Sequence, residues 1–372
     1  MYKSILNEGI SSKKMQPSIY NPHNFTKERD IVLSAETRSL LEKASLVYEQ
    51  NFKGKTWYGR CIFLSWYCSL GDCTFCFRST QKHKIKHPSG SRRSISSVSL
   101  EALFCRQFNW RIEFLTGGYG MMPFSDFLEY VKAVVAVYGE KIWLNIGLLS
   151  PEQLEELTPY VKGICASMET LNPELHKKVC PSKPIAPYDK MLSTIGNRFK
   201  KSIAVIVGLG DTLEDMKYLF DFIEKHNLDR VTVYALKPVK GTEFTQGPSV
   251  EEYVQWIARL RVRFPKLEII AGTNLRRSEE VGYLLKAGAN AITKFPALKQ
   301  FGTKKAKLID SLIRNEGRDF ISNFVDVPAN IDWDKEIDSL DLKEKYKTEM
   351  KKIMSDYLLK FSNPEDVDGS VE

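Results

Sequence analysis

The sequence predicts an α/β fold, a (β/α)8 TIM barrel with helical N- and C-terminal extensions. From about Lys55 onward, short apolar runs alternate with longer amphipathic segments, a pattern typical of repeated βα units around a parallel sheet. Eight such runs occur before about Asn315, and roughly 250 residues is the length that a complete barrel needs. An open doubly wound sheet is the alternative, but the first apolar run is not followed by the glycine-rich phosphate loop that such a sheet usually carries.

The eight expected strands are these apolar runs, and most are followed by a segment of helical character. They lie at residues 61–66, 111–117, 141–147, 163–169, 202–208, 230–236, 267–273 and 289–295. Most of the intervening segments begin with Ser, Thr or Asp and carry acidic residues in the first turn, as helix N-termini prefer.

The segments outside the barrel are also predicted to be helical. Residues 1–54 form an N-terminal extension around "SAETRSLLEKASLVYEQ", residues 55–315 form the barrel, and residues 316–372 form a charged tail. Apolar residues recur at helical spacing in the tail, so we expect a helix that packs on the barrel. A contact between two copies of the chain, giving a homodimer, is the alternative role for this tail.

Composition and charge exclude several classes of protein. With 372 residues and 43% hydrophobic content, the chain can bury a large core and is not generally disordered. A net charge of +8 gives a mild preference for anionic partners, too small and dispersed to predict nucleic-acid binding. The N-terminus has no apolar signal region, and no apolar stretch approaches membrane-spanning length. We therefore expect a cytoplasmic protein with neither a membrane nor a nucleic acid as partner.

The cysteines predict a metal or redox site. In a reducing compartment the seven cysteines should not form disulfides. Three of them, Cys68, Cys73 and Cys76, lie in "CSLGDCTFC" directly after the first expected strand, on the rim where barrel active sites are built. Three thiolates on a short loop can hold a 4Fe–4S cluster and leave one iron open to a substrate or cofactor.

Two other uses of these thiols are open. A structural zinc site could use Cys73 and Cys76 with Cys68 or Cys61 and with His83 or His87, although no second CxxC stands at finger or ribbon spacing. A thioredoxin-type dithiol fits less well, because that motif opens a helix and needs no third cysteine.

The cysteine loop, with Phe75 before its last cysteine, resembles that of the radical S-adenosylmethionine (SAM) superfamily. The usual intervals are three residues and then two, whereas this loop has four and then two. The segment "LTGGYG" resembles the superfamily's glycine motif, which implies that Thr116, Gly117 and Gly118 meet the amino group of SAM; Tyr119 stands where an acid is usual.

Later segments extend the resemblance to about residues 55–315 and imply further SAM contacts. "ASMET" resembles the motif that holds the ribose and methionyl groups, which implicates Ser167 and Glu169, and Asn145 in "NIGLLS" is a further candidate. "IVGLGDT", "KPVKGTEF" and "AGANAITKF" resemble biotin synthase and its relatives. The first of these would lie against adenine through Val207, Gly208 and Leu209.

The departures from biotin synthase indicate a different product. The ligands of its second, sulfur-donating cluster would fall near Leu115, Trp143, Ser202 and Thr273, none of which can serve. The chain looks more like the branch members that rearrange or build a cofactor, and we lean to the radical enzyme of iron-guanylylpyridinol cofactor assembly for the methanogen Fe-hydrogenase. An archaeal-type lipoyl synthase component is the rival, and a non-catalytic zinc-binding barrel is the alternative of another class.

The resemblance implies a mechanism and two kinds of partner. A reduced cluster would donate one electron to SAM, and the resulting 5′-deoxyadenosyl radical would abstract hydrogen from a small-molecule substrate. No strong base is required, so none of the five histidines receives a catalytic role. The segment 78–93 carries six Lys or Arg and two His. It is a solvated loop, or it contacts an anionic substrate or an acidic electron donor such as ferredoxin or flavodoxin.

The remaining cysteines receive no ligand role. Cys105 is expected to be a buried helix residue, because free cysteine packs as a small hydrophobe. Cys165 is expected to pack in the core, although its strand aims alternate residues into the barrel. Together, Cys105, Cys165 and Cys180 are too scattered in the sequence to predict a second cluster.

Overall fold

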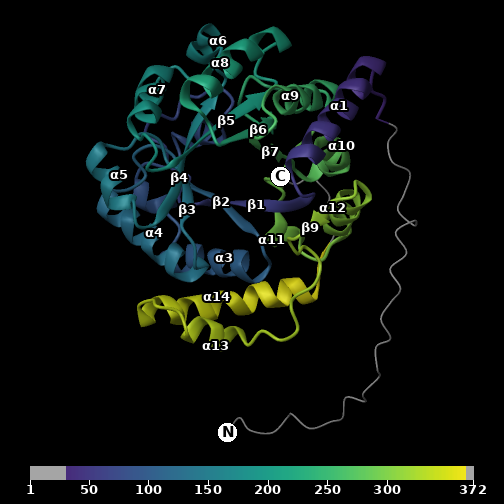
Figure 1. The fold of residues 1–372 in the computed structure, drawn as a ribbon. Coiled ribbons are helices and arrows are strands. Elements are labelled where there is room, and N and C mark those ends of the chain that lie inside the picture. Colours follow the sequence, from purple (N-terminus) through teal and green to yellow (C-terminus); the bar gives the residue numbers. More distant parts are fainter. Residues whose placement is uncertain (1–30, 366–372) are drawn as a thin grey trace, which may run out of the picture.

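Eight parallel strands form a closed barrel in the computed structural model, which describes residues 31–365. Consecutive strands are neighbours, and β8 pairs with β1 to close the ring. Figure 1 shows the strands at the centre with helices around them. The predicted (β/α)8 fold is therefore confirmed. The strands are β1 Lys55–Phe63, β2 Arg111–Thr116, β3 Ile142–Asn145, β4 Val161–Glu169, β5 Lys200–Val207, β6 Arg230–Ala235, β7 Glu268–Gly272 and β8 Ala291–Thr293.

The first strand differs from its prediction. It begins at Lys55 rather than Cys61 and ends at Phe63 rather than Trp66. Its first half pairs with β8, and its second half pairs with β2. Its first two residues, Lys55 and Thr56, pair with a short later strand at residues 319–320, and the β8 pairing begins at Trp57. Pairing with distant segments therefore fixes where β1 begins, and it is not visible in the local sequence.

Helices alternate with the strands, and several of them begin at Ser, Thr or Asp as predicted, whereas α4, α8 and α10 have no side-chain cap. At seven helix starts, a side chain accepts a hydrogen bond from a backbone N–H in the first turn. These residues are Ser34, Ser94, Ser150, Asn172, Ser249, Thr303 and Asp332. The helices are α1 Ala35–Asn51, α2 Phe77–Gln81, α3 Ile95–Gln107, α4 Phe124–Tyr138, α5 Pro151–Leu157, α6 Pro173–Val179, α7 Ile185–Thr194, α8 Met216–His226, α9 Val250–Arg263, α10 Val281–Lys286, α11 Ala297–Gln300, α12 Lys304–Asn315, α13 Trp333–Asp338 and α14 Glu344–Ser362.

Both extensions pack on the barrel. Helix α1 lies against α9, where Thr37 hydrogen-bonds to Glu251 at 2.6 Å. A short strand, β9 Asp319–Phe320, pairs with the start of β1. In the tail, α14 runs along α3 (Figure 1), and the ring of Phe104 contacts those of Tyr357 and Phe361. A role for this tail in a dimer stays a prediction, as do the domain boundaries. Between residues 31 and 365, no helix has the length and apolar character needed to span a bilayer.

Candidate active site

The cysteine loop connects β1 to α2 at the carboxyl ends of the strands. Cys68, Cys73 and Cys76 are free and partly buried. The backbone N–H of Ser69 donates to the Tyr119 carbonyl at 2.9 Å, and the N–H of Thr74 donates to the Val179 carbonyl at 3.0 Å. The loop is therefore held by the segment after β2 on one side and by the end of α6 on the other.

The glycine pair after β2 lies directly against this loop. A Cβ atom added to Gly118 would lie 2.6 Å from Cys68 Cβ and 2.8 Å from Cys68 Cα, and it would also overlap the Tyr67 carbonyl oxygen. Any side chain at this position would displace the first cysteine. Thr116 is buried at the end of β2, and its carbonyl accepts a hydrogen bond from Leu64 N–H at 2.9 Å. The glycine motif and the cysteine loop thus form one structural unit.

The donor set fits a cluster better than a single metal ion. Among residues 31–365, no three His, Cys, Asp or Glu side chains converge closely enough to hold one ion. A structural zinc ion needs four convergent donors, whereas a 4Fe–4S cluster distributes its cysteine ligands over different irons. Cys61, one zinc candidate, lies inside the barrel with its thiol 2.8 Å from Glu113 Oε2. Three free thiols on one loop are the ligands that a cluster requires.

Cys180 lies at the cysteine loop, a position that the sequence did not indicate. It follows α6, is buried, and forms a hydrogen bond between its thiol and that of Cys73. This contact lowers the pKa of Cys73. Cys73 and Phe75 also pack against Val179, Cys180 and Leu209. The backbone bond between Thr74 and Val179 brings these segments together, across about a hundred residues of sequence, so the contact depends on the tertiary fold.

The polar residues at the ends of β3 and β4 form a connected group. Ser167 Oγ donates to Asn145 Oδ1 at 3.0 Å. Glu169 has a left-handed backbone with φ of 60°, and its carboxylate pairs with Lys183 at 2.6 Å. Lys183 Nζ also donates to the Ser167 carbonyl at 2.9 Å. Burial opposes the charged form of Lys183, but the Glu169 carboxylate raises its pKa. Lys183 is a site residue that the sequence did not indicate.

The three candidate residues after β5 have different environments. Val207 packs its side chain into the core outside the barrel, and its carbonyl accepts from Leu236 N–H at 2.9 Å. Gly208 has a φ of +101°, which favours glycine. Leu209 contacts the group around Cys73 and Phe75. Of the three, Leu209 lies beside the cysteine loop through its side chain.

The buried carboxylate of Glu113 lies inside the barrel and is hydrogen-bonded to side chains of several strands. Glu113 on β2 is fully buried and accepts hydrogen bonds from four side chains on β1, β6 and β8. These donors are Cys61 at 2.8 Å, Thr232 at 2.9 Å, Tyr234 at 3.1 Å and Thr293. Burial, followed by the charge of Glu113, raises the pKa of Cys61 to about 12. In the sequence, the only sign of this network is an acidic residue, Glu113, within an apolar strand. Glu113 was assigned no role from the sequence.

The other cysteines and the described histidines have structural surroundings. Cys105 is buried in α3, as predicted, and Cys165 packs inside the barrel with Phe114, Trp143 and Ala204. His176 contacts two backbone carbonyls, and His226 Nε2 lies 2.6 Å from Asp189. His83 and His87 are exposed, and His23 lies outside the described residues.

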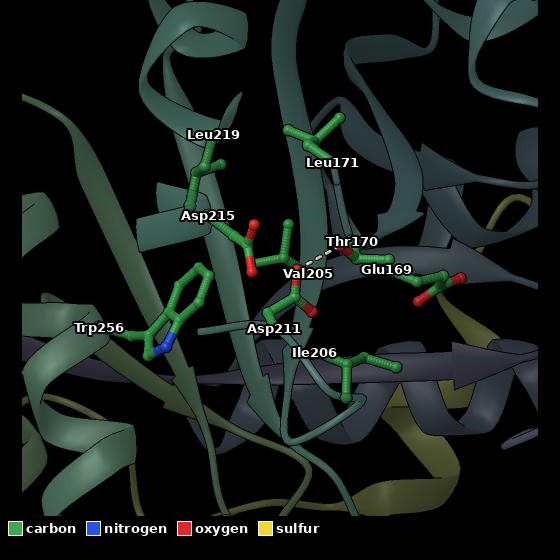
Figure 2. A pocket seen from close by; sticks show the side chains of 9 residues that line it. All are labelled: Glu169, Thr170, Leu171, Val205, Ile206, Asp211, Asp215, Leu219 and Trp256. Atoms are coloured by element: carbon green, nitrogen blue, oxygen red, sulfur yellow. Dashed lines mark hydrogen bonds between the residues drawn. The ribbon is translucent and has the colours of Figure 1, made fainter. Parts of the chain in front are cut away.

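A small enclosed cavity lies behind Glu169, between the barrel wall and the outer helices. Figure 2 shows Asp211 and Trp256 among the residues that line it, with Thr170 hydrogen-bonded to Asp211. Burial raises the pKa of Asp211 to about 6. The indole N–H of Trp256 has no partner in the described part of the chain. Glu169 thus lines this cavity as well as belonging to the group at the end of β4.

The basic segment 78–93 divides into two parts. Arg92 pairs with Asp126 at 2.8 Å and Arg93 pairs with Glu101 at 2.6 Å, so both hold the fold. Lys82, Lys84 and Lys86 are exposed, although Lys82 also donates to the Leu70 carbonyl in the cysteine loop at 2.7 Å. An open pocket beside them is lined by Trp66, Tyr67, Cys68, Ser69, Arg78, Gln81, Lys82, Ile85 and Lys86.

Comparisons with known proteins match two families over most of the barrel. Residues 64–223 match the Radical SAM superfamily, and residues 232–315 match the Biotin and Thiamin Synthesis associated domain. An uncharacterized protein of Methanocaldococcus jannaschii is 34% identical over 299 residues, which cover 78% of this chain and 83% of that relative. A biotin synthase of Clostridium tetani is 26% identical over a region that covers 63% of this chain and 74% of the biotin synthase.

Solved structures show the same fold at low identity. Methylornithine synthase superposes with a TM-score of 0.60 at 22% identity, covering 70% of this chain and 79% of its own. The FeFe-hydrogenase maturase HydG of Carboxydothermus hydrogenoformans gives 0.63 at 17% identity, covering 88% of this chain and 83% of its own. The superfamily works with a 4Fe–4S cluster and SAM, which are therefore the cofactors of this chain. The chain belongs to the radical SAM superfamily and is a biotin synthase-like radical SAM enzyme.

Proposed function

We propose that Cys68, Cys73 and Cys76 bind the cluster and that the chain generates a radical from SAM to build a cofactor. The observation that carries this assignment is the contact between Gly118 and Cys68, which places the glycine motif against the first cysteine. When held by these cysteines, the reduced cluster would supply one electron for cleavage of SAM into methionine and a 5′-deoxyadenosyl radical, which would take hydrogen from the substrate.

The residues around the loop position SAM in this proposal. The backbone of Thr116, Gly117 and Gly118 meets its amino group, because glycines permit close approach of a ligand. Asn145, Ser167 and Glu169 hold the ribose and methionyl groups. Their mutual contacts, with Lys183 behind Glu169, fix their orientation before SAM binds. The adenine ring of SAM lies against Phe75, Val207, Gly208 and Leu209.

The product is a cofactor rather than a sulfur-inserted vitamin in this proposal. Two positions that would supply ligands to a second cluster are Trp143, which packs inside the barrel, and Ser202, which is buried. Neither is a cysteine or an arginine. The product in this proposal is the iron-guanylylpyridinol cofactor of the Fe-hydrogenase. The substrate is a small molecule, and an acidic electron donor in the cytoplasm reduces the cluster near Lys82, Lys84 and Lys86.

The test is anaerobic reconstitution of the full chain. We expect a brown protein with about four irons per chain, the count of one such cluster, that releases 5′-deoxyadenosine from SAM under dithionite. The variant Cys73→Ala should lose iron and cleavage together. Cys105→Ala is the matched control, because Cys105 is buried in α3 away from the loop. A colourless protein that binds zinc would contradict the proposal.

A further inference from the structure

Lys294 has an unusual backbone at the mouth of the barrel. It directly follows β8, at the end of the strands that carries the cysteine loop. Its φ is 68°, in the left-handed region that non-glycine residues rarely adopt. Strained residues of this kind cluster at ligand sites, where the surrounding structure holds them in place.

Two aromatic rings hold the ammonium group of Lys294. Its Nζ lies 4.6 Å from the ring centre of Phe63 and 5.0 Å from that of Tyr234. Both rings pack against the apolar layer inside the barrel. The Tyr234 hydroxyl donates to Glu113, and so does that of Thr293, the residue before Lys294. The buried carboxylate thus fixes both the ring beneath the ammonium and the backbone that carries it.

Lys294 and a second cation lack anionic partners. Within residues 31–365, Lys294 Nζ makes no ion pair or hydrogen bond. The Arg78 guanidinium lies 5.5 Å from the centre of the same Phe63 ring and donates to the Ser65 carbonyl at 3.2 Å. Its Nε is buried without a partner in the described part of the chain. Both side chains are partly buried, where a cation without an anionic partner is poorly compensated, so the pair is suited to an anion.

The location separates Lys294 from the proposed SAM contacts on β4, whereas Arg78 lies in α2, directly after the cysteine loop. In the ring of eight strands, β8 lies opposite β4, where Ser167 and Glu169 are found. We propose that Lys294, assisted by Arg78, binds a carboxylate or phosphate group of the substrate. This inference rests on the proposed function, because it assigns the opposite side of the barrel to SAM.

The side chains around Lys294 indicate the chemical character of the rest of the substrate. Phe63 and Tyr234 lie above an apolar layer made by Cys61, Phe114, Trp143, Cys165 and Ala204. Flat apolar groups fit such surfaces, and a few polar groups fix their orientation. The structure therefore assigns to this site a substrate with one anionic group on a compact apolar or aromatic body.

The probes are benzoate, phenyl phosphate and the neutral benzamide, which has nearly the shape of benzoate. Their dissociation constants are measured by ligand-observed NMR titration of the anaerobically reconstituted full chain, with and without SAM. We expect at least one anion to bind about tenfold more tightly than benzamide, the effect of one good charge-assisted contact. The anion that binds more tightly identifies the carboxylate or the phosphate as the preferred group.

Three variants locate the effect. Lys294→Met should remove the preference for the anion, and Lys294→Arg should retain it. Lys299→Met is the matched control: it removes the same charge from an exposed position in α11 and should also retain the preference. Equal binding of anions and benzamide, or a preference that survives in Lys294→Met, would overturn the inference.

Two further readouts separate this inference from the proposed function. Displacement of the anion by SAM would show that the cations hold the carboxylate of SAM itself, which also overturns the substrate assignment. Iron content and SAM cleavage are measured on the same preparation. A chain that cleaves SAM without preferring an anion contradicts this inference alone, whereas a chain without a cluster contradicts the proposed function.

Discussion

Lys183 donates a hydrogen bond to Glu169, with 2.6 Å between Nζ and Oε1, and both side chains are largely buried. The pair joins the segment after α6 to the end of β4, beside the candidate SAM contacts. A buried ion pair of this kind holds a carboxylate in one orientation, and loss of one partner leaves the other charge buried.

We expect Lys183→Met to destabilise the chain and to weaken SAM binding. Removing one partner of a buried ion pair costs about 3 kcal/mol, and a freed Glu169 would no longer be fixed toward the ribose. Equilibrium dialysis with SAM and thermal unfolding measure the two effects. Lys178→Met, at an exposed position in α6, is the control. Unchanged SAM affinity in a folded Lys183→Met protein would remove Glu169 and its partner from the site.

The replacement Gly118→Ala should strongly impair cluster binding. Its Cβ would overlap Cys68 and the Tyr67 carbonyl, so the loop must move. Iron content after reconstitution measures the effect, and we expect most of the iron to be lost. Gly90→Ala is the matched control, because a Cβ at Gly90 meets no atom within 4 Å. Full iron content in Gly118→Ala would show that the glycine motif and the cysteine loop are independent.

Ionisation of Asp211 should make the stability of the fold depend on pH in a defined direction. Burial raises its pKa to about 6 from 3.8, so the folded state holds a proton that the unfolded state has released between these values. Stability is therefore lost as pH rises through this window. We expect Asp211→Asn to gain thermal stability relative to wild type from about pH 4 to pH 6, with no further gain above. A difference independent of pH would contradict this assignment.

Charge reversal should separate electron delivery from chemistry. We expect Lys82→Glu, Lys84→Glu and Lys86→Glu together to slow reduction by an acidic flavodoxin about tenfold or more, because complementary charge steers association. Reduction by dithionite should stay unchanged. The same exchange at Lys345, Lys352 and Lys360, exposed on α14, is the control. Equal rates with flavodoxin would exclude this surface as the docking site.

Local patterns predicted the strands and the helix starts, because apolar runs and capping side chains act within a few residues. They failed where a contact joins distant segments. The true start of β1 depends on pairing with β9 and β8, and the approach of Cys180 to Cys73 depends on how the end of α6 packs on the loop. The glycine motif was placed by resemblance, and its contact with Cys68 required the fold.

The barrel interior could not be predicted for a related reason. An acid in a strand does not reveal its partners, and the donors to Glu113 come from strands far apart in the sequence. The special position of Lys294 likewise could not be predicted, because neither its left-handed backbone nor its contact with two aromatic rings is encoded within a short segment.

The central claim is that three cysteines hold the cluster and leave one iron open to SAM, with Cys180 beside it but not bound to it. Mössbauer spectroscopy of the chain reconstituted with ⁵⁷Fe, recorded with and without SAM, tests this most directly. We predict that SAM changes the signal of one iron and that Cys180→Ala gives the same change. A fourth iron already ligated by a protein thiolate and insensitive to SAM would contradict the account.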